Sequence, residues 1–443
     1  MLSLYSVDII VTWGIVVKRL FSLVMILLFS SVFMLSAQTQ EEASTSTIAW
    51  AIANQVFVWD ADSNAARELD TFAESATVQR INLSPDGTRL AIVWATIGDD
   101  GYTPENHQLN IATLNPDDGF SNERVINFND LYPDNDSETV ISQYDWADNT
   151  TIYFSSGIAS QVYSNPNNDL WRVSIDTGDI TSIVPPRVSG NFVVNPYDDS
   201  VIMMTAGDYN DEIDGTIVLM EADGQSRQLL SFPTVATASE YYFYPQINWL
   251  DEQTIWMAIP DRDSIYQMGE EDAPPISLWQ LDFESGDSEI IGEVNADFFG
   301  VPALSPDGTA ISYLQRTDFN EFSLYVADVN GENEELIQTD VMSRGHWLNG
   351  LNSLLFYTDE GAFIQPIGEL AQPLRGQTDP RYNVLRVYSN ANGDIVFVGY
   401  YGEPVGGTFE LRHTHIDSLS EEAQLLVATT SNIGFFNVSL VGD

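Results

Sequence analysis

The chain contains no cysteine, which excludes disulfide bridges, thiolate metal sites and cysteine nucleophiles. Basic residues are scarce: 65 Asp and Glu stand against 16 Lys and Arg, the formal net charge is −49, and Lys18 is the only lysine. Such a surface repels phosphate backbones and anionic lipid, so we expect no nucleic-acid partner and no membrane binding by the mature form. It favours cations or a basic partner, and it equally suits solubility in a salty or extracellular setting.

Several catalytic signatures are also missing. The sequence has no G-x-S-x-G elbow of serine hydrolases, no G-x-G-x-x-G dinucleotide pattern and no Walker pattern. With 65 acidic residues, a carboxylate pair picked by eye for glycosidase chemistry has no specificity. Long amphipathic helical windows are absent, yet 44% of the residues are hydrophobic, so the chain can bury a sizeable core.

Residues 1–37 have the pattern of an export signal. A basic Lys-Arg pair at 18–19 precedes an apolar run at 21–34, and Leu-Ser-Ala at 35–37 offers a small residue at the cleavage point before residue 38. The run is too short for a typical transmembrane helix, and an uncleaved anchor is the alternative. Cleavage would remove Asp8 and the basic pair, which takes the net charge from −49 to −50. We therefore expect a periplasmic or extracellular protein.

A Ser/Thr-rich linker covers 38–47, and short extended segments follow. The clearest is Ile-Asn-Leu-Ser-Pro-Asp-Gly-Thr-Arg-Leu-Ala-Ile at 81–92, where one apolar strand enters a turn and a second leaves it. Proline presets φ for the second position of a tight turn, and Asp and Gly tolerate the left-handed geometry that follows. The phrase returns as Ala-Leu-Ser-Pro-Asp-Gly-Thr-Ala-Ile-Ser-Tyr at 303–313. This predicts an internal repeat.

Weaker copies of the turn, each followed by an apolar strand, lie at 145–150, 195–200, 248–253, 346–350 and 389–394. All the copies together recur every 42 to 62 residues, the period of a propeller blade with insertions. A second strand pair with an Asp- or Gly-containing turn follows several of them, as at 170–179, 278–287 and 324–331. The repeating unit is therefore four strands, a to d.

The Leu-Ser-Pro-Asp-Gly-Thr phrase and the Leu-Tyr-Val-Ala-Asp phrase at 324–328 resemble the TolB-type, WD40-like β-propeller repeat. Two copies match well, and the other five are degenerate because Pro or Gly is replaced. The resemblance implies an all-β fold, a single β-propeller over 48–443. By resemblance, TolB-type propellers act as envelope interaction modules, but a fold does not fix a function.

The two ends of the repeat region complement each other. Segments at 48–53, 55–60 and 66–69 supply strands b, c and d of a first unit, and 433–443 has the pattern of a lone strand a. We predict that the C-terminal strand pairs with the N-terminal blade and closes the ring, which removes the open sheet edges. The count is then eight blades. Seven is the fallback, because the unit at 341–376 has the weakest pattern.

In such a blade the a–b and c–d turns lie on one face, and the b–c loops and d–a connections lie on the other. The second face is predicted to carry long insertions, at 95–106, 155–168, 206–215, 260–275 and 316–322. Long loops in compact folds are commonly functional. The candidate partner-binding residues on this face are Asp99, Asp100, Glu105, Asp261, Asp263, Glu270, Glu271 and Asp272.

One loop is dense in carboxylates, namely Asp208, Asp211, Glu212 and Asp214. Hard cations take oxygen ligands, so these residues are the candidate metal ligands and calcium is the only cofactor considered. Their spacing fits no known calcium loop, and a solvated acidic loop is the competing interpretation. The segment at 60–64 begins like a calcium loop but lacks the Gly and Glu that complete one.

Two other residue types recur in ways that suggest packing. His413 and His415 share one face of a strand, and no third metal ligand is implied, so we expect them between blades. Trp146, Trp249 and Trp347 occupy one slot of the repeat beside the a–b turn. Repetition at one slot predicts packing between blades rather than a sugar platform.

These observations favour a monomeric, non-catalytic, extracytoplasmic scaffold whose acidic long-loop face meets a protein or polysaccharide partner. No catalytic residue is assigned. The competing hypothesis is a glycan-acting hydrolase or lyase, which would need two convergent carboxylates with a raised pKa at the channel mouth. A third hypothesis is a calcium-stabilised adhesin. A melting temperature that does not change when EDTA is added would exclude this hypothesis.

Overall fold

The computed structural model describes the chain from Ser46 onward. The described part is 46–443 without 62–63, 99–103, 116–118, 128–130, 132–138, 159–168, 186–189, 199, 239–241, 269, 271–272, 319–320, 343–344, 375–381, 403–406, 431–436 and 442–443. The predicted export signal lies outside it, as does the linker up to residue 45. Among the described residues, no helix has the length and hydrophobicity needed to cross a membrane.

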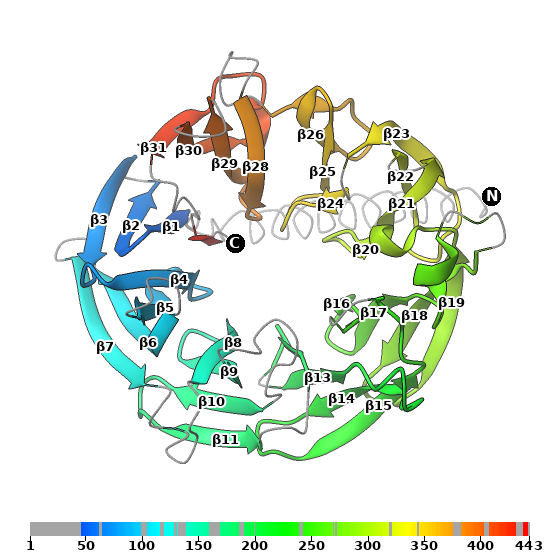
Figure 1. Cartoon of the computed structure of the whole chain (residues 1–443), viewed down its shortest axis with the longest axis horizontal. Coiled ribbons are helices and arrows are strands. Elements are labelled where there is room, and N and C mark those ends of the chain that lie inside the picture. Colours follow the sequence, from blue (N-terminus) through cyan, green and yellow to red (C-terminus); the bar gives the residue numbers. More distant parts are fainter. Residues whose placement is uncertain are drawn as a thin grey trace, which may run out of the picture. The chain divides into compact units, whose positions relative to one another are not determined.

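Eight four-stranded antiparallel sheets are arranged as the blades of a ring (Figure 1). Blade 1 contains β1 (Thr47–Ile52), β2 (Gln55–Asp60), β3 (Ala65–Thr71) and β32 (Asn437–Val441), and blade 2 contains β4 (Ala76–Leu83), β5 (Arg89–Ile97), β6 (Pro104–Asn115) and β7 (Gly119–Asn127). Blade 3 contains β8 (Thr139–Trp146), β9 (Thr151–Ile158), β10 (Leu170–Ser174) and β11 (Ile180–Val184), and blade 4 contains β12 (Phe192–Val194), β13 (Val201–Thr205), β14 (Gly215–Met220) and β15 (Ser226–Phe232).

The second half of the ring follows the same order. Blade 5 contains β16 (Asn248–Trp249), β17 (Thr254–Ile259), β18 (Ile276–Asp282) and β19 (Ser288–Val294), and blade 6 contains β20 (Ala303–Leu304), β21 (Ala310–Asp318), β22 (Glu321–Asp328) and β23 (Glu335–Val341). Blade 7 contains β24 (His346–Trp347), β25 (Ser353–Thr358), β26 (Gly361–Pro366) and β27 (Gln372–Pro373), and blade 8 contains β28 (Tyr382–Ser389), β29 (Asp394–Tyr401), β30 (Thr408–His415) and β31 (Gln424–Thr429). Short 3-10 helices are η2 (Ser264–Gln267), η3 (Phe298–Gly300) and η4 (Ile416–Ser418).

The ring closes as the sequence predicts. Strand β1 pairs with β2 on one side and with β32 on the other, with Ile48 opposite Leu440 and Trp50 opposite Val438. The predicted pairing of the C-terminal strand with the N-terminal blade is thus confirmed, and so is the count of eight. Blade 7, the weakest in the sequence, is a four-stranded blade with two very short strands.

The repeated Ser-Pro-Asp-Gly-Thr phrase forms a hydrogen-bonded turn between the first two strands of a blade. In blade 2, Asp86 Oδ1 accepts hydrogen bonds from Ser84 Oγ (2.7 Å), the Thr88 amide (3.0 Å) and Thr88 Oγ1 (2.8 Å). Gly87 follows with φ at +68°, in the left-handed region that glycine enters at little cost. The carboxylate therefore organises the turn, and the glycine supplies its backbone geometry.

Replacing Gly87 isolates the backbone contribution. A Cβ added there would meet its nearest atom, Thr47 Oγ1, at 3.5 Å, which is ordinary contact. We expect Gly87→Ala to lower the free energy of unfolding by about 1 kcal/mol because of its positive φ. Gly87→Asn should cost less, since Asn tolerates this conformation. Urea unfolding measures both, and an equal loss in the two variants would contradict the explanation.

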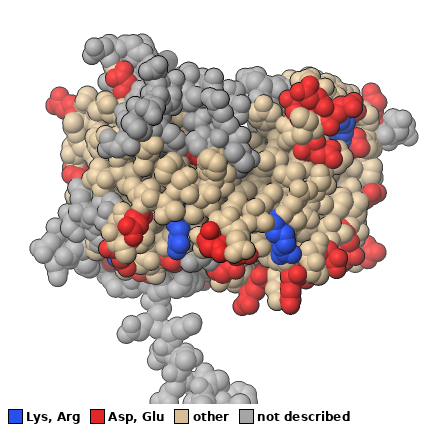
Figure 2. Space-filling view, turned by 90° about the horizontal axis from the view of Figure 1, so that it is seen from below, with Lys and Arg blue, Asp and Glu red and all other residues tan. Residues whose placement is uncertain are grey.

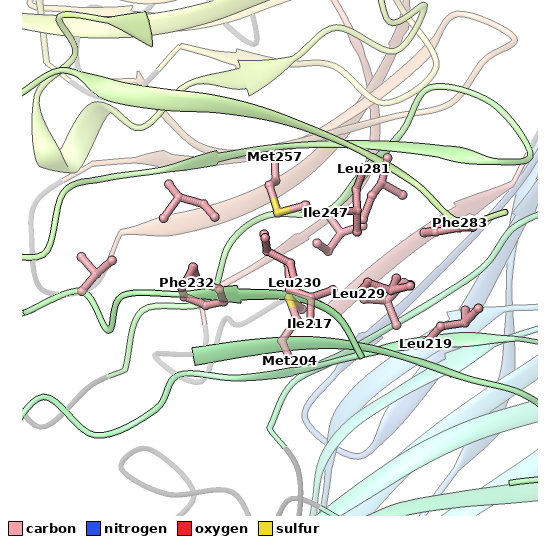
Figure 3. Close-up of a cluster of buried hydrophobic side chains, with 14 residues drawn as sticks. Met204, Ile217, Leu219, Leu229, Leu230, Phe232, Ile247, Met257, Leu281 and Phe283 are labelled. Atoms are coloured by element: carbon pink, nitrogen blue, oxygen red, sulfur yellow. The ribbon is translucent and has the colours of Figure 1, made fainter. Parts of the chain in front are cut away.

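The core lies between neighbouring blades. Strand β14, the third strand of blade 4, alternates buried and half-buried side chains, whereas every residue of β17, the second strand of blade 5, is buried. Figure 3 shows one interblade layer, in which Met204, Ile217 and Leu230 of blade 4 pack with Met257 of blade 5. Fully burying one such side chain stabilises the fold by roughly 1.5–3 kcal/mol. Each blade therefore depends on its neighbours for stability.

The recurring tryptophans pack between blades, as predicted. Trp146 Nε1 donates to the Asn82 carbonyl oxygen of blade 2 (3.1 Å), and Trp347 Nε1 donates to the Ala303 carbonyl oxygen of blade 6 (2.9 Å). Trp249 meets the ring of Tyr197 of blade 4 edge-on, with centroids 6.2 Å apart, and that of Phe283 in its own blade at 5.0 Å. Two of the three indoles thus tie the first strand of one blade to the first strand of the blade before it.

One predicted insertion is wrong. Residues 316–322 were expected to form a loop, but β21 and β22 continue to pair there, with Arg316 opposite Phe322 and Asp318 opposite Glu321. The segment at 95–106 is likewise part strand, because β5 runs to Ile97 and β6 begins at Pro104. In both segments the paired strands extend into the predicted loop, and polar residues alone do not distinguish such paired strands from a loop.

Candidate functional site

The b–c loops and d–a connections lie together on one face, here called the long-loop face; the a–b and c–d turns form the tight-turn face. The acidic loop of blade 4 is on the long-loop face. Its Asp208 pairs with Ile213 in an isolated bridge, and Asp208 Oδ1 accepts from the amides of Asn210 (2.9 Å) and Asp211 (3.1 Å). This carboxylate is therefore used to turn the chain. Asp214 Oδ2 accepts from Ser231 Oγ at 3.4 Å.

The proposed calcium ligands do not form a ligand set here. Within the described part of the chain, no three His, Asp or Glu side chains are placed to hold a metal ion. Asp211 and Glu212 are exposed at the tip of the loop. The calcium hypothesis stays a prediction.

Two predicted loops meet where blade 4 adjoins blade 5. Tyr209 donates its hydroxyl proton to Asp263 Oδ1 (2.7 Å), and Arg262 Nη2 donates to the Tyr209 carbonyl oxygen (2.8 Å). The Arg262 guanidinium also lies 4.6 Å from the centre of the Tyr209 ring, a cation–π contact. The hydrogen bond to Asp263 raises the pKa of the Tyr209 hydroxyl. The acidic β13–β14 loop is thus bound to the β17–β18 loop by hydrogen bonds and a cation–π contact.

The predicted partner-binding residues divide into three groups. Asp261 and Glu270 are exposed in the β17–β18 loop, where Asp263 is half-buried, and Glu105 is exposed on β6 in blade 2. The remaining four lie outside the described residues: Asp99, Asp100, Glu271 and Asp272. Acidic side chains far outnumber basic ones on the side of the molecule seen in Figure 2.

A cavity of about 350 Å³ opens on the long-loop face between blades 5 and 6, and we call it the η2 cavity. Its lining comes from three segments: Ser264, Met268, Glu270 and Pro274 in the β17–β18 loop, Asn295–Phe298 in the β19–β20 connection, and Gln315 and Arg316 on β21. Of these residues, only Glu270 was a candidate from the sequence.

A fixed ion pair forms one wall of the η2 cavity. Arg316 Nε lies 2.8 Å from Asp297 Oδ2, and its Nη2 lies 3.4 Å from Asp297 Oδ1. The Asp297 side chain is 1% exposed and also accepts from the Phe299 amide (2.9 Å), which caps η3. The Arg316 guanidinium stacks 4.8 Å from the centre of the Phe322 ring. Among the described residues, Nη1 of Arg316 has no hydrogen-bond partner.

Ser264, at the start of η2, is a second unusual member of the lining. The residue is 7% exposed, and its Oγ is buried with no hydrogen-bond partner in the described structure. Buried hydroxyls are normally paired, because an unmet one costs about 1–3 kcal/mol.

The same face carries several exposed apolar side chains. Among the described residues, the large hydrophobic side chains exposed on the long-loop face are Ile213, Tyr242, Tyr266, Phe299 and Met342, between 45% and 68% exposed. All of them lie between β13 and β24, on loops of blades 4 to 6 and on the connection into blade 7. Tyr266 and Phe299 adjoin the η2 cavity in sequence, and the Phe299 ring meets Phe298 edge-on at 5.5 Å.

The first strands of the blades face the centre of the ring (Figure 1). Burial raises the pKa of the Asp145 carboxyl on β8. Hydrogen bonds from the Trp146 amide and the Asn82 side chain act in the opposite direction but do not outweigh burial. A second cavity of about 790 Å³, bordered by first strands of blades 5 to 7 and their turns, includes Gln246, Asn248 and His346 but no Asp or Glu in its lining. Among the described residues, the cavity at the centre of the ring therefore has no pair of convergent carboxylates in its lining. The glycan-acting hydrolase or lyase stays a hypothesis.

Of the two histidines expected between blades, His413 packs between blades 8 and 1, whereas His415 caps η4 and its Nε2 lies 2.9 Å from the Asn392 carbonyl oxygen of its own blade. The Nε2 of His413 lies 2.7 Å from Asp394 Oδ1, and its ring centre lies 4.7 Å from that of Trp59. Asn390 Nδ2 donates to Asp394 Oδ2 (3.2 Å) and to the Val441 carbonyl oxygen of β32 (3.3 Å). These contacts form a polar network at the ring closure.

No protein-family model matches the sequence, and no characterised protein matches it at the sequence level. Among solved structures, the fold is similar to the β-propeller domain of the Trilobed protease from Pyrococcus furiosus, with a TM-score of 0.48 and 12% identity over 82% of this chain and 99% of that one. The fold is also similar to that of an oligogalacturonate lyase in complex with manganese, with a TM-score of 0.48 and 13% sequence identity. That match covers 84% of this chain and 99% of the lyase chain. The acylaminoacyl peptidase of Pyrococcus horikoshii matches with a TM-score of 0.46 and 12% sequence identity. That match covers 80% of this chain and 52% of the peptidase chain, so the chain spans about half of that enzyme.

Similarity at this level concerns the fold alone, since unrelated activities share such folds. The site must be argued from the residues of this chain. The sheet topology and ring closure establish that the chain forms an eight-bladed β-propeller.

Proposed function

We propose that this protein is an extracytoplasmic, non-catalytic binding propeller of the TolB type, which holds its partner on the long-loop face of blades 4 to 6. The observation that carries the proposal is the group of exposed apolar side chains between β13 and β24 on that face. Large apolar groups exposed together on a soluble protein mark interaction sites. On the tight-turn face, Tyr197 in blade 4 and Ile367 in blade 7 have comparable exposure, and Leu370 in blade 7 is 88% exposed.

The charge of the chain restricts the partner. A net charge of −49 disfavours nucleic acid and anionic lipid, which leaves proteins and polysaccharides. On the long-loop face the apolar groups are interleaved with carboxylates such as Asp261 and Glu270. Apolar anchors with polar neighbours are typical of binding surfaces, where the apolar groups supply most of the affinity and the polar groups supply specificity.

A paired substitution tests the role of this face. We expect Tyr266→Ala with Phe299→Ala to weaken binding by the mature chain at least about tenfold, equivalent to 1.4 kcal/mol, because each removes an exposed aromatic contact. The matched control is Tyr197→Ala with Leu370→Ala on the tight-turn face. Binding is measured by biolayer interferometry against a panel of oligosaccharides and isolated envelope proteins.

Circular dichroism and thermal melting confirm that both double variants fold. The control should bind like the unmodified chain. Equal losses in both variants, or a loss confined to the tight-turn variant, would place the binding surface elsewhere and refute the proposal.

A further inference from the structure

We propose that the long-loop face of blades 4 to 6 binds a basic polypeptide, one that presents Arg or Lys side chains beside apolar ones. The inference rests on the binding role proposed above for this face, and it narrows the partner from proteins and polysaccharides to a positively charged protein segment. Three observations carry it: the loops of the three blades are connected, their exposed apolar side chains include aliphatic ones, and their exposed carboxylates have no basic partner among the described residues.

The loops of blades 4 to 6, which are consecutive in the ring (Figure 1), are bonded to one another. Tyr209 of the β13–β14 loop donates to Asp263 of the β17–β18 loop, and the Ala236 amide of the β15–β16 connection donates to the Arg262 carbonyl oxygen (2.8 Å). The β17–β18 loop, the β19–β20 connection and β21 together line the η2 cavity. These contacts hold the loops in place before a partner arrives, which lowers the entropy cost of binding.

The exposed apolar side chains suit a polypeptide better than a glycan. Tyr266 and Phe299 are aromatic, and aromatic rings could stack on a sugar or on a protein side chain. Ile213 is 55% exposed and Met342 is 68% exposed, and neither has a ring. Such side chains gain most when apolar area on both partners is removed from water, and a hydroxyl-covered sugar offers little of it. Apolar side chains of a protein offer more.

The exposed charges of this surface are mostly negative. The exposed carboxylates of the β13–β14 and β17–β18 loops in the described structure are Asp211, Glu212, Asp214, Asp261 and Glu270. None of these five forms an ion pair within the described structure. In sequence, residues 271 and 272 add two more acidic side chains to the second loop. The apolar side chains therefore stand among carboxylates that a partner could neutralise.

The two described arginines of this surface do not offset that charge. Arg316 lies 2.8 Å from Asp297, whose side chain is 1% exposed, so this pair carries no net charge. Arg262 donates to the Tyr209 carbonyl oxygen and lies over the Tyr209 ring, and it supplies one positive charge against the five exposed carboxylates. A cationic partner is therefore attracted to this surface, whereas an acidic protein or a uronate polymer is repelled.

The same charge argues against a second copy of this chain as the partner. In a two-fold symmetric dimer the same patch of each subunit forms the interface. Carboxylates of one copy would then lie opposite carboxylates of the other, and such like-charge contacts oppose association. A basic segment instead meets each carboxylate with an opposite charge, while its apolar side chains cover those of the face.

The test measures binding of the mature chain, residues 38–443, to three synthetic peptides by biolayer interferometry. The peptides share one spacing of Leu and Phe, and the positions between them are all Arg, all Gln or all Glu. We expect the Arg peptide to bind at least about tenfold more tightly than the Gln peptide and the Glu peptide to bind most weakly. Added salt should weaken the Arg peptide, because salt screens exposed charges.

A charge reversal locates the contact. We expect Asp211→Lys with Glu270→Lys to weaken the Arg peptide at least about tenfold. The matched control is Glu221→Lys with Glu252→Lys, which changes the net charge equally in the same two blades but on the tight-turn face. The control should stay within about twofold of the unmodified chain, because charges beyond the Debye length are screened. All four side chains are exposed and none makes a hydrogen bond in the described structure, so both variants should fold, which thermal melting checks.

The outcomes separate this inference from the proposed function. Equal losses in the two reversal variants, or equal binding of the Arg and Gln peptides, refute the basic partner, as does a glucosamine oligosaccharide that binds more tightly than the Arg peptide. If a neutral oligosaccharide or the Glu peptide binds best, in a way that Tyr266→Ala with Phe299→Ala weakens, the basic partner is refuted and the binding face stands. If no ligand depends on the long-loop face, both proposals fail.

Discussion

Removing β32 should lower the free energy of unfolding by on the order of 5 kcal/mol, from the lost ladder and the newly exposed apolar surface. The strand covers one side of β1, where Ile48 and Trp50 are fully buried. Ser439 on β32 also accepts a hydrogen bond from the Leu83 amide of blade 2 through its Oγ (3.0 Å). Since whole domains are stable by only about 5–15 kcal/mol, this loss approaches the total.

The experiment compares a chain that ends at Phe436 with one that ends at Val441, which keeps β32. Urea unfolding followed by tryptophan fluorescence reports the midpoint of each. We expect the longer chain to match the full protein and the shorter one to unfold at far lower urea or to aggregate through its open edge. Identical midpoints would mean that ring closure contributes little to stability.

Acid should weaken the same junction through Asp394. Burial would raise the pKa of this carboxyl, but hydrogen bonds from His413, Ser46 and Asn390 outweigh it and bring the pKa to about 2, against 3.8 for the free group. The folded pKa is the lower one, so the stabilisation is present above pH 4 and is lost as the pH falls through 2. The depression corresponds to about 2 kcal/mol at neutral pH.

Asp394→Asn separates this carboxyl from the many others. At pH 7 the variant should be less stable than the unmodified protein by about 2 kcal/mol, because the charged hydrogen bond to His413 is lost. The difference should shrink between pH 4 and pH 2, where the unmodified carboxyl takes up its proton. Urea midpoints measured across this range give the difference directly. A gap that does not change with pH would show that Asp394 acts through packing alone.

The fold was predictable because its strongest constraints are local. Asp86 and Gly87 are required by one turn, and the same chemistry recurs at Asp307 and Gly308, where φ is +71°. Turn chemistry is visible in a short window of sequence, so the repeat could be counted even where Pro is replaced. Blade 7 was the least certain because its strands β24 and β27 contain two residues each and leave little pattern.

The η2 cavity was not predictable, because its lining comes from three segments whose local patterns are ordinary. Ser264 is one serine in a polar loop, and Asn295 is one residue in a connection; only the packing of blades 5 and 6 brings them together. Arg316 carried a weak signal in the sequence. The chain has only 16 basic residues, so an arginine near the end of a predicted strand is unusual. The acidic residues were conspicuous in the sequence. In the structure, Asp208 and Asp263 accept hydrogen bonds that stabilise the conformation of the loops.

The pairing of β1 with β32 also fixes the order of events during synthesis. Thr47, among the first residues of the propeller to leave the ribosome, is partnered by Val441, among the last. Blade 1 therefore keeps an unpaired edge until the last strand of the propeller has been made. Contacts this distant in sequence form slowly, because a long loop must be closed before they stabilise anything. The final step of folding is thus reserved for chains that have been translated to their last strand.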